Sequence, residues 1–358
     1  MFLGLRRHDL RDALLVWAVW LAAVLGFVAV CVAVGLIPSG PAEKGMPGVT
    51  RIGPLWPLRS WDFARYARIA VDGYPAGQVV RENAFFPLWP AILAAGRPLV
   101  HMSVVGGLVA WAAAAAAFVG VAALNPDGDA RRTAIALALM PGSFSLALAY
   151  PDGLALAAAV WACVIALRGP PLAAVPLALL PALARPNGFL LAIPLYLIAR
   201  RRGTRLGLVA AAAPLVGSAA VHLLLWARTD DPLAFTHAQR YWDRGGPWML
   251  PWSLVRVLWT GHLQTVAEAA VAALVIWLCV LLFRRGAAYR PWAWYAAAVL
   301  ALSLGSGSFQ SIPRQALYAF PLVWVAAARP GWLADRRVLA GAVAVNAGLI
   351  LALPLMPP

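Results

Sequence analysis

Long apolar runs separated by short polar stretches dominate the chain. They lie near residues 13–37, 103–124, 133–149, 153–167, 171–184, 188–199, 206–226, 264–283, 291–304, 316–328 and 338–355. A helix needs about 20 apolar residues to cross the hydrocarbon layer, so this pattern predicts an all-α polytopic membrane protein with about 9–11 transmembrane helices. We expect one integral membrane domain over residues 1–358.

Two of these runs, 171–184 and 188–199, are too short to cross a bilayer alone. Between them lies Arg185-Pro186-Asn187-Gly188, which interrupts the apolar pattern. Non-helical backbone at membrane depth is tolerated only where protein or a water-filled cavity surrounds it. We therefore expect two half-length helices that meet at this polar break.

The composition excludes several classes of protein. Hydrophobic residues make up 63% of the chain and charged residues 12%, whereas a soluble domain is about half apolar and about a quarter charged. A cytosolic enzyme, a disulfide scaffold and a disordered chain are therefore excluded. The 3 cysteines lie deep in apolar runs, which suits neither a disulfide framework nor a metal site.

The net charge of +15 comes from arginines that cluster between apolar runs. The clusters are Arg6/Arg7/Arg11, Arg131/Arg132, Arg200/Arg201/Arg202/Arg205, Arg284/Arg285/Arg290 and Arg336/Arg337. This is the distribution of a positive-inside membrane protein, so we expect no nucleic-acid partner. It places the N-terminus in the cytoplasm and residues 38–102 outside, as a first extracytoplasmic loop with juxtamembrane helices.

The first external loop contains an amphipathic stretch. Its apolar positions follow helical spacing, at Phe63, Tyr66, Ala67 and Ala70. We expect this helix to lie on the outer membrane surface, where Arg65 and Arg68 reach lipid phosphates. Ser60 is suited to cap its start, which places Asp62 in the first turn beside Trp61. Asp62 either complements the helix dipole or acts as a general base toward a lipid-linked substrate.

A second carboxylate follows in the aromatic segment 81–90. Glu82 borders Phe85 and Phe86, and the aromatic residues alone suit a short interfacial element. As a site residue, Glu82 would orient an acceptor hydroxyl or help to hold a divalent cation, Mg²⁺ or Mn²⁺. The histidines elsewhere in the chain have no spacing suited to a metal.

Further polar residues fall at the outer ends of apolar runs. Asp152 lies in a Tyr-Pro-Asp-Gly sequence that turn chemistry alone explains. An arginine at membrane depth needs a buried partner or an anionic ligand, and both readings apply to Arg185. The loop 237–247 is polar, aromatic and glycine-bearing, and is either solvated or closes over a substrate. Arg314 either clamps a phosphate or snorkels to the interface.

The order of these motifs resembles the PIG-V family, whose eukaryotic members add the second mannose during GPI-anchor synthesis. The resemblance covers about residues 55–325. It rests on Trp61-Asp62 through Gly73-Tyr74, Glu82 with Ala84-Phe-Phe-Pro-Leu88, Pro141 with Ala149-Tyr-Pro-Asp152, Ala184-Arg-Pro-Asn-Gly188, His237-Ala-Gln239 with Trp242 and Arg244, and Arg314 with Phe320-Pro321. The sequence departs from the family at Asp152, where glutamate is common, and at Gln315, where a tyrosine follows the arginine.

The resemblance implies a glycosyltransferase of GT-C type that takes mannose from a polyprenyl-phosphate carrier on the extracytoplasmic face, with inversion to an α-linked product. It implies Asp62 and Glu82 as catalytic carboxylates, and Arg185, Arg314 and Arg65 as ligands of the donor phosphate. The remaining expected substrate contacts are Trp61, Tyr74, Asp152, Asn187, His237, Gln239 and Trp242.

Three alternatives remain open at the level of sequence. A transporter or flippase of lipid-linked sugars would show paired repeats or interrupted helices in corresponding halves, and we find neither. A non-catalytic scaffold would not need long polar external loops. Within the enzyme class the donor sugar is mannose, glucose or arabinose. The Ala/Arg-rich composition points to the plasma membrane of a GC-rich bacterium, where a mannolipid, a cell-wall glycan or a protein hydroxyl would be the acceptor.

Overall fold

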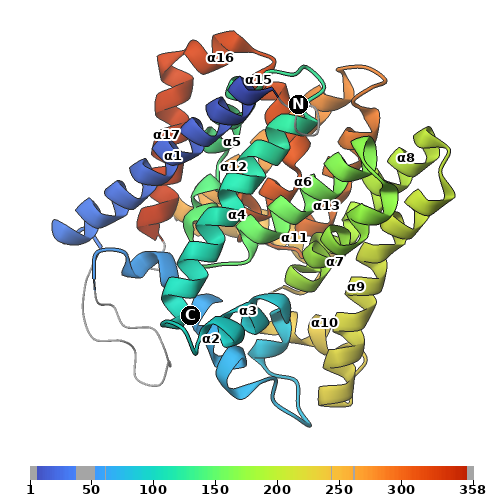
Figure 1. Cartoon of the computed structure of the whole chain (residues 1–358). Helices are drawn as coiled ribbons and strands as arrows, with labels where there is room; N and C mark the ends of the chain where they lie inside the picture. The colour runs from blue at the N-terminus through green and yellow to red at the C-terminus, as the bar shows by residue number, and fades with distance from the viewer. Residues whose placement is uncertain (1–5, 38–52, 61, 243, 261–262, 353–358) are drawn as a thin grey trace.

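The fold is described from a computed structural model that places residues 6–37, 53–60, 62–242, 244–260 and 263–352. Helices are the only regular secondary structure in these residues (Figure 1). Four of them are long and apolar enough to cross a membrane: α1 (Arg7–Ala33), α4 (Met102–Leu124), α9 (Arg205–Thr229) and α12 (Leu263–Phe283). The described residues are therefore all-α and include four helices that could cross a membrane, while the expected total of about 9–11 spans stays a prediction.

Shorter helices pack around these four. They are α5 (Ala130–Leu139), α6 (Asp152–Arg168), α7 (Val175–Ala184), α8 (Ala192–Arg202), α13 (Arg290–Leu304), α15 (Val323–Ala327) and α17 (Arg336–Ala352). Small residues bring α4 and α6 into close contact, as is common where membrane helices cross. A Cβ on Gly120 would lie 2.4 Å from Val160 Cγ2, and one on Gly153 would lie 2.9 Å from the carbonyl oxygen of Ala110.

The predicted break between the two short apolar runs is confirmed. Helix α7 ends at Ala184, Arg185 has extended backbone with φ −146° and ψ 144°, and a 3-10 segment η5 (Pro186–Leu191) precedes α8. Gly188 makes this arrangement feasible, because a Cβ there would lie 2.1 Å from the carbonyl oxygen of Pro181. The break holds Arg185 within the bundle rather than at its end.

The run 133–149 is not one helix, contrary to the sequence pattern. Helix α5 ends at Leu139, Gly142 adopts a left-handed conformation with φ +91°, and a 3-10 segment η3 (Ser143–Ala147) follows. Pro141 lacks the N–H that would continue the helix, and a Cβ on Gly142 would lie 2.2 Å from the carbonyl oxygen of Pro313. The run 316–328 is broken in the same way, into η8 (Ala316–Tyr318), η9 (Phe320–Leu322) and α15.

The first loop covers one end of the bundle. It contains α2 (Asp62–Asp72), the 3-10 segment η2 (Arg81–Ala84) and α3 (Leu88–Gly96), which lie near α10 (Ala234–Ala238) in Figure 1. Helix α2 is packed into the protein on more than one face, and its predicted position on the outer membrane surface stays a prediction. Phe63 and Ala67 are fully buried and Arg65 is 8% exposed, because α2 packs against α3 and the bundle on more than one face.

Candidate functional site

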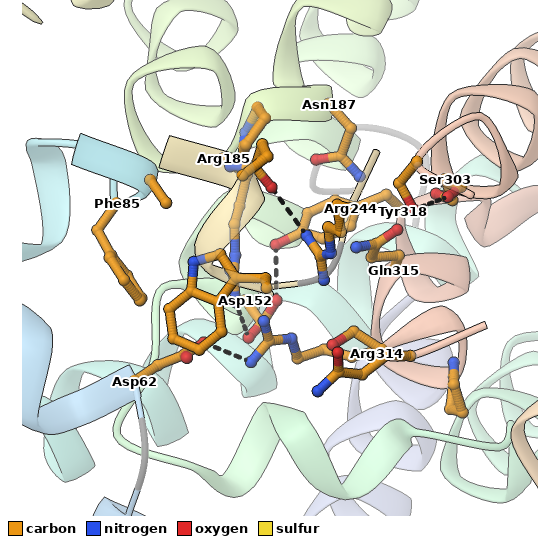
Figure 2. A pocket seen from close by; sticks show the side chains of 18 of the residues that line it. Asp62, Phe85, Asp152, Arg185, Asn187, Arg244, Ser303, Arg314, Gln315 and Tyr318 are labelled. Atoms are coloured by element: carbon orange, nitrogen blue, oxygen red, sulfur yellow. Dashed lines mark hydrogen bonds and ion pairs between the residues drawn. The ribbon is translucent and has the colours of Figure 1, made fainter. Parts of the chain in front are cut away.

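A cavity of about 200 Å³ opens between the first loop and the broken segments of the bundle (Figure 2). Many residues predicted for the site line it: Asp62, Arg65, Asp152, Arg185, Asn187, Gln239, Trp242 and Arg314. They come from α2, α6, the α7–η5 break, the loop after α10, and α14 (Ile312–Gln315). Residues far apart in the chain thus meet at one place.

Asp62 is fixed at the start of α2 by a buried tyrosine. The backbone N–H of Asp62 donates to the Tyr150 hydroxyl at 3.2 Å, and that hydroxyl donates to the carbonyl oxygen of Ser60 at 2.6 Å. Ser60 was expected to cap this helix, but its own hydroxyl donates to the carbonyl oxygen of Pro57 at 2.8 Å. Tyr150 therefore sets the position from which the Asp62 carboxylate faces the cavity.

The Asp62 carboxylate forms an ion pair across the cavity. Arg314 Nη1 lies 2.7 Å from Asp62 Oδ2, and the guanidinium lies 5.5 Å from the centre of the Tyr150 ring. Arg314 reaches this position because its neighbour Pro313 packs directly against Gly142. Positive charge is therefore placed beside the carboxylate before any substrate binds.

A second ion pair joins Asp152 and Arg185, which belong to two other motifs of the sequence. Arg185 Nη2 donates to Asp152 Oδ2, and the Tyr318 hydroxyl donates to Asp152 Oδ1 at 3.0 Å. The Asp152 side chain is 1% exposed and that of Arg185 is 11% exposed. Of the two readings open for Arg185, a buried partner and an anionic ligand, the structure supplies the buried partner.

Glu82 lies behind the cavity, not on its wall. Its Oε1 accepts from Arg65 Nη1 at 2.9 Å and from Arg68 Nη1 at 3.1 Å, and the residue is 5% exposed. Glu82 thus ties η2 to α2 and neutralises Arg65, which does line the cavity. Glu82 therefore contacts α2 and not the cavity, and its predicted role as a catalytic carboxylate stays a prediction.

The side chains do not fit the expected Mg²⁺ or Mn²⁺. Within the described part of the chain no three His, Cys, Asp or Glu residues gather where they could hold a metal ion. One oxygen of each of the Asp62, Asp152 and Glu82 carboxylates accepts a hydrogen bond from an arginine, so each carboxylate already faces a cationic side chain.

Two other predicted substrate contacts, Tyr74 and His237, do not line the cavity in the described structure. The Tyr74 hydroxyl donates to the carbonyl oxygen of Phe85 at 2.6 Å and so positions an aromatic ring that does line the cavity. His237 Nδ1 lies 2.5 Å from Asp231 Oδ2, where its hydrogen bond lowers the pKa of that carboxyl and anchors the start of α10. Trp61 lies outside the described residues.

One face of the cavity is aromatic and apolar. Phe85 and Trp242 meet edge to face with ring centroids 5.9 Å apart. Phe144, Leu148, Leu302 and Leu349 extend the apolar lining. A site with this face and several arginines suits a ligand that is both apolar and anionic.

Some residues of the cavity were not among the expected catalytic or substrate-binding residues. Arg244, Glu268, Ser303, Gln315 and Tyr318 also line the cavity. Arg244 Nη1 donates to Gln239 Oε1 at 3.2 Å. Burial, followed by repulsion from Arg314, lowers the pKa of Arg244 from 12.5 to about 10. The glycine-bearing loop 237–247 was the signal that pointed to Arg244, whereas Glu268 lies inside an apolar run with no local motif.

Comparison of the sequence with protein-family models gives no match, and comparison with curated proteins gives none. The likeness to the PIG-V family therefore stands on the motifs in the sequence. What the structure adds is that several of these motifs supply residues to one cavity.

Proposed function

We propose that the protein is a GT-C type glycosyltransferase related to the PIG-V family. It moves mannose from a polyprenyl-phosphate-mannose donor to a hydroxyl of a glycolipid or glycan acceptor. The reaction takes place on the extracytoplasmic face of a bacterial plasma membrane. The observation that carries the proposal is the carboxylate of Asp62, at the start of the first-loop helix, facing a cavity lined by arginines and aromatic rings.

Asp62 is the general base in this mechanism. The acceptor oxygen bonds to the anomeric carbon of the donor while its proton passes to the Asp62 carboxylate. The bond between that carbon and the phosphate oxygen breaks, and polyprenyl phosphate leaves with the electron pair. Attack from the face opposite the phosphate converts a β-linked donor into an α-linked product. A positioned base contributes about 10²- to 10⁴-fold to such a rate.

The ion pair between Asp62 and Arg314 is suited to respond to an anionic donor. Arg314 Nη1 lies 2.7 Å from Asp62 Oδ2. A donor phosphate in the cavity competes for this guanidinium, so its arrival releases the carboxylate to accept a proton. As the leaving phosphate gains charge, the arginines around it stabilise the transition state more than the ground state.

The apolar lining completes the proposed assignment. Phe85 and Trp242 offer ring faces and edges to a sugar, and the Leu148 and Leu302 side chains offer apolar contact to the prenyl chain. Asn187 and Gln239 are the neutral polar residues predicted for substrate contact, and both line the cavity. These side chains orient the donor, while Asp62 and the arginines act on the reacting bond.

Replacing Asp62 by Asn tests the assignment of the base. The amide keeps the size of the side chain but cannot take up the proton, so we expect Asp62→Asn to lower the rate of mannose transfer at least about 100-fold. Asp72→Asn is the matched control, because Asp72 ends the same helix and is exposed. Asp72→Asn is expected to transfer at the wild-type rate, and a fully active Asp62→Asn enzyme would remove Asp62 from the mechanism.

A further inference from the structure

The arginines that line the cavity differ in how they are paired. Arg65 is bound to Glu82, Arg185 to Asp152 and Arg314 to Asp62. No carboxylate among the described residues lies within ion-pair distance of Arg244. Arg244 therefore brings a positive charge to the cavity that the neighbouring side chains do not neutralise by direct contact.

The hydrogen bonds of Arg244 are also incomplete. Its Nη1 donates to the neutral amide oxygen of Gln239 at 3.2 Å, and its Nε, like that of Arg185, is buried without a partner in the described structure. A guanidinium offers five N–H donors in a planar fork that matches a carboxylate or a phosphate. Leaving such donors unsatisfied in a buried site is unfavourable, and a bound anion would satisfy them.

The backbone holds Arg244 in place at the cavity. The N–H of Gly246 donates to the carbonyl oxygen of Ser306 at 3.3 Å. Gly246 has φ +108°, and a Cβ on Gly307 would lie 2.1 Å from the carbonyl oxygen of Gly246. This close crossing of two glycine-bearing segments fixes the loop that carries Arg244 against the segment that carries Ser303 and Ser306.

We propose that Arg244 is the primary binding residue for a phosphate group in this cavity, carried by a ligand that is a lipid phosphate monoester or diester. The lipid part of this inference rests on the proposed function, whereas the anion site rests on the charges and hydrogen bonds of the cavity alone. Arg314 and Arg185 can bind the same phosphate only if they give up their ion pairs with Asp62 and Asp152. The neutral side chains of Asn187 and Gln315, which line the same cavity, are available for further hydrogen bonds (Figure 2).

The electrostatics of the site also favour Arg244 as the primary phosphate-binding residue. Burial and the proximity of Arg314 lower the pKa of Arg244, so its cationic form is poorly stabilised without a ligand. A phosphate oxyanion beside it would raise that pKa again. The three paired arginines already have their counter-charges, and so they gain less from the same anion.

Binding of a short-chain isoprenyl phosphate to the purified full-length protein in detergent tests the proposal. Affinity would be measured by calorimetry, with the uncharged isoprenyl alcohol and inorganic phosphate as separate ligands. Arg244→Gln is expected to weaken isoprenyl phosphate binding roughly 10- to 100-fold, because charge-assisted hydrogen bonds are lost. Arg240→Gln is the matched control, since Arg240 lies in the same loop but is exposed and does not line the cavity.

The melting temperature distinguishes a binding role for Arg244 from a structural role. If Arg244 binds a phosphate, Arg244→Gln leaves the melting temperature of the ligand-free protein unchanged or higher. The same variant removes the rise in melting temperature that isoprenyl phosphate produces in the wild type. Arg244→Lys, which keeps the charge but not the fork, is expected to bind with intermediate affinity. Wild-type affinity in Arg244→Gln, or equal affinity for the alcohol and the phosphate, would overturn the proposal.

The same binding measurement separates this inference from the proposed enzyme activity. Binding that depends on Arg244 without any sugar transfer would support the anion site and contradict the glycosyltransferase. Sugar transfer that depends on Asp62, together with an affinity for isoprenyl phosphate that does not depend on Arg244, would support the glycosyltransferase and contradict the anion site. Inorganic phosphate that binds as tightly as isoprenyl phosphate would overturn the lipid part of the proposal.

Discussion

Two carboxylates that line the cavity, Asp62 and Asp152, are each paired with an arginine from another part of the chain. Arg314 is 252 residues from Asp62, and Arg185 is 33 residues from Asp152. The resemblance to the PIG-V family implied that these residues share a site. The pairing itself was not predictable, since it depends on how α6, α14 and the α7–η5 break pack together. Tyr150 was read only as part of a turn, although its hydroxyl orients Asp62.

The buried pair of Asp152 and Arg185 leads to a prediction about stability. Removing one partner of a buried ion pair leaves an uncompensated charge and costs about 3–5 kcal/mol. We expect Arg185→Gln to lower the melting temperature of the purified protein markedly, because Asp152 is 1% exposed and loses its cation. The double variant Asp152→Asn with Arg185→Gln should recover much of that loss, because the neutral amides hydrogen-bond without a buried charge.

Differential scanning fluorimetry in detergent would measure both variants. A single variant as stable as the wild type would contradict a structural role for the pair. It would leave Arg185 free to act mainly as a ligand of the donor phosphate.

At the scale of elements, the polar break at 185–188 was predictable and the break at 140–142 was not. A polar sequence with proline and glycine inside an apolar stretch signals an interruption directly. Pro141 and Gly142 carry the same chemistry, but they lie in a run whose apolar residues continue on both sides. The break at 140–142 depends on the close approach of Pro313 to Gly142, and such a tertiary contact is not visible in the sequence. The first-loop helix was located correctly, but its burial by α3 and the bundle was missed for the same reason.

The break between α7 and η5 gives a test at this scale. A Cβ on Gly188 would lie 2.1 Å from the Pro181 carbonyl oxygen, and a backbone atom at this position cannot move aside cheaply. We expect Gly188→Ala to destabilise the protein by about 2–3 kcal/mol and to displace Arg185 from Asp152. Gly341→Ala in α17 is the matched control, because a Cβ there meets nothing within 4 Å.

Thermal unfolding of the two glycine variants, compared with the wild type, would check this expectation. Gly341→Ala should unfold at or above the wild-type temperature, since alanine is the better helix former. Equal stability of the two variants would show that the close packing at Gly188 is not required.

At the scale of the molecule, the first loop and one of the basic clusters lie toward opposite ends of the bundle. The first loop and α10 cover one end, and the turn between α8 and α9, with Arg200, Arg201 and Arg202, lies toward the other (Figure 1). This arrangement agrees with the predicted orientation, in which basic loops face the cytoplasm and the cavity faces outward. Composition predicted a membrane protein, with which the four long apolar helices agree, whereas the orientation indicated by the arginines stays a prediction.

Labelling of introduced cysteines tests this orientation. The native thiols Cys31, Cys163 and Cys279 are buried, so they give little background. A membrane-impermeant maleimide applied to intact cells is expected to label Gln78→Cys, in the exposed part of the first loop. It should label Arg201→Cys only after the membrane is permeabilised. The opposite pattern would invert the topology and place the cavity in the cytoplasm.

Sugar transfer by the purified protein tests the proposed function most directly. Purified protein in detergent would be incubated with polyprenyl-phosphate mannose and glycolipids extracted from bacterial membranes, and both products would be quantified by mass spectrometry. We predict that mannose appears on the acceptor and that an equal amount of polyprenyl phosphate is released, without any second membrane compartment. If mannose, glucose and arabinose donors all bind but no sugar reaches an acceptor, the protein is not a glycosyltransferase and the carrier of lipid-linked sugars becomes the better account.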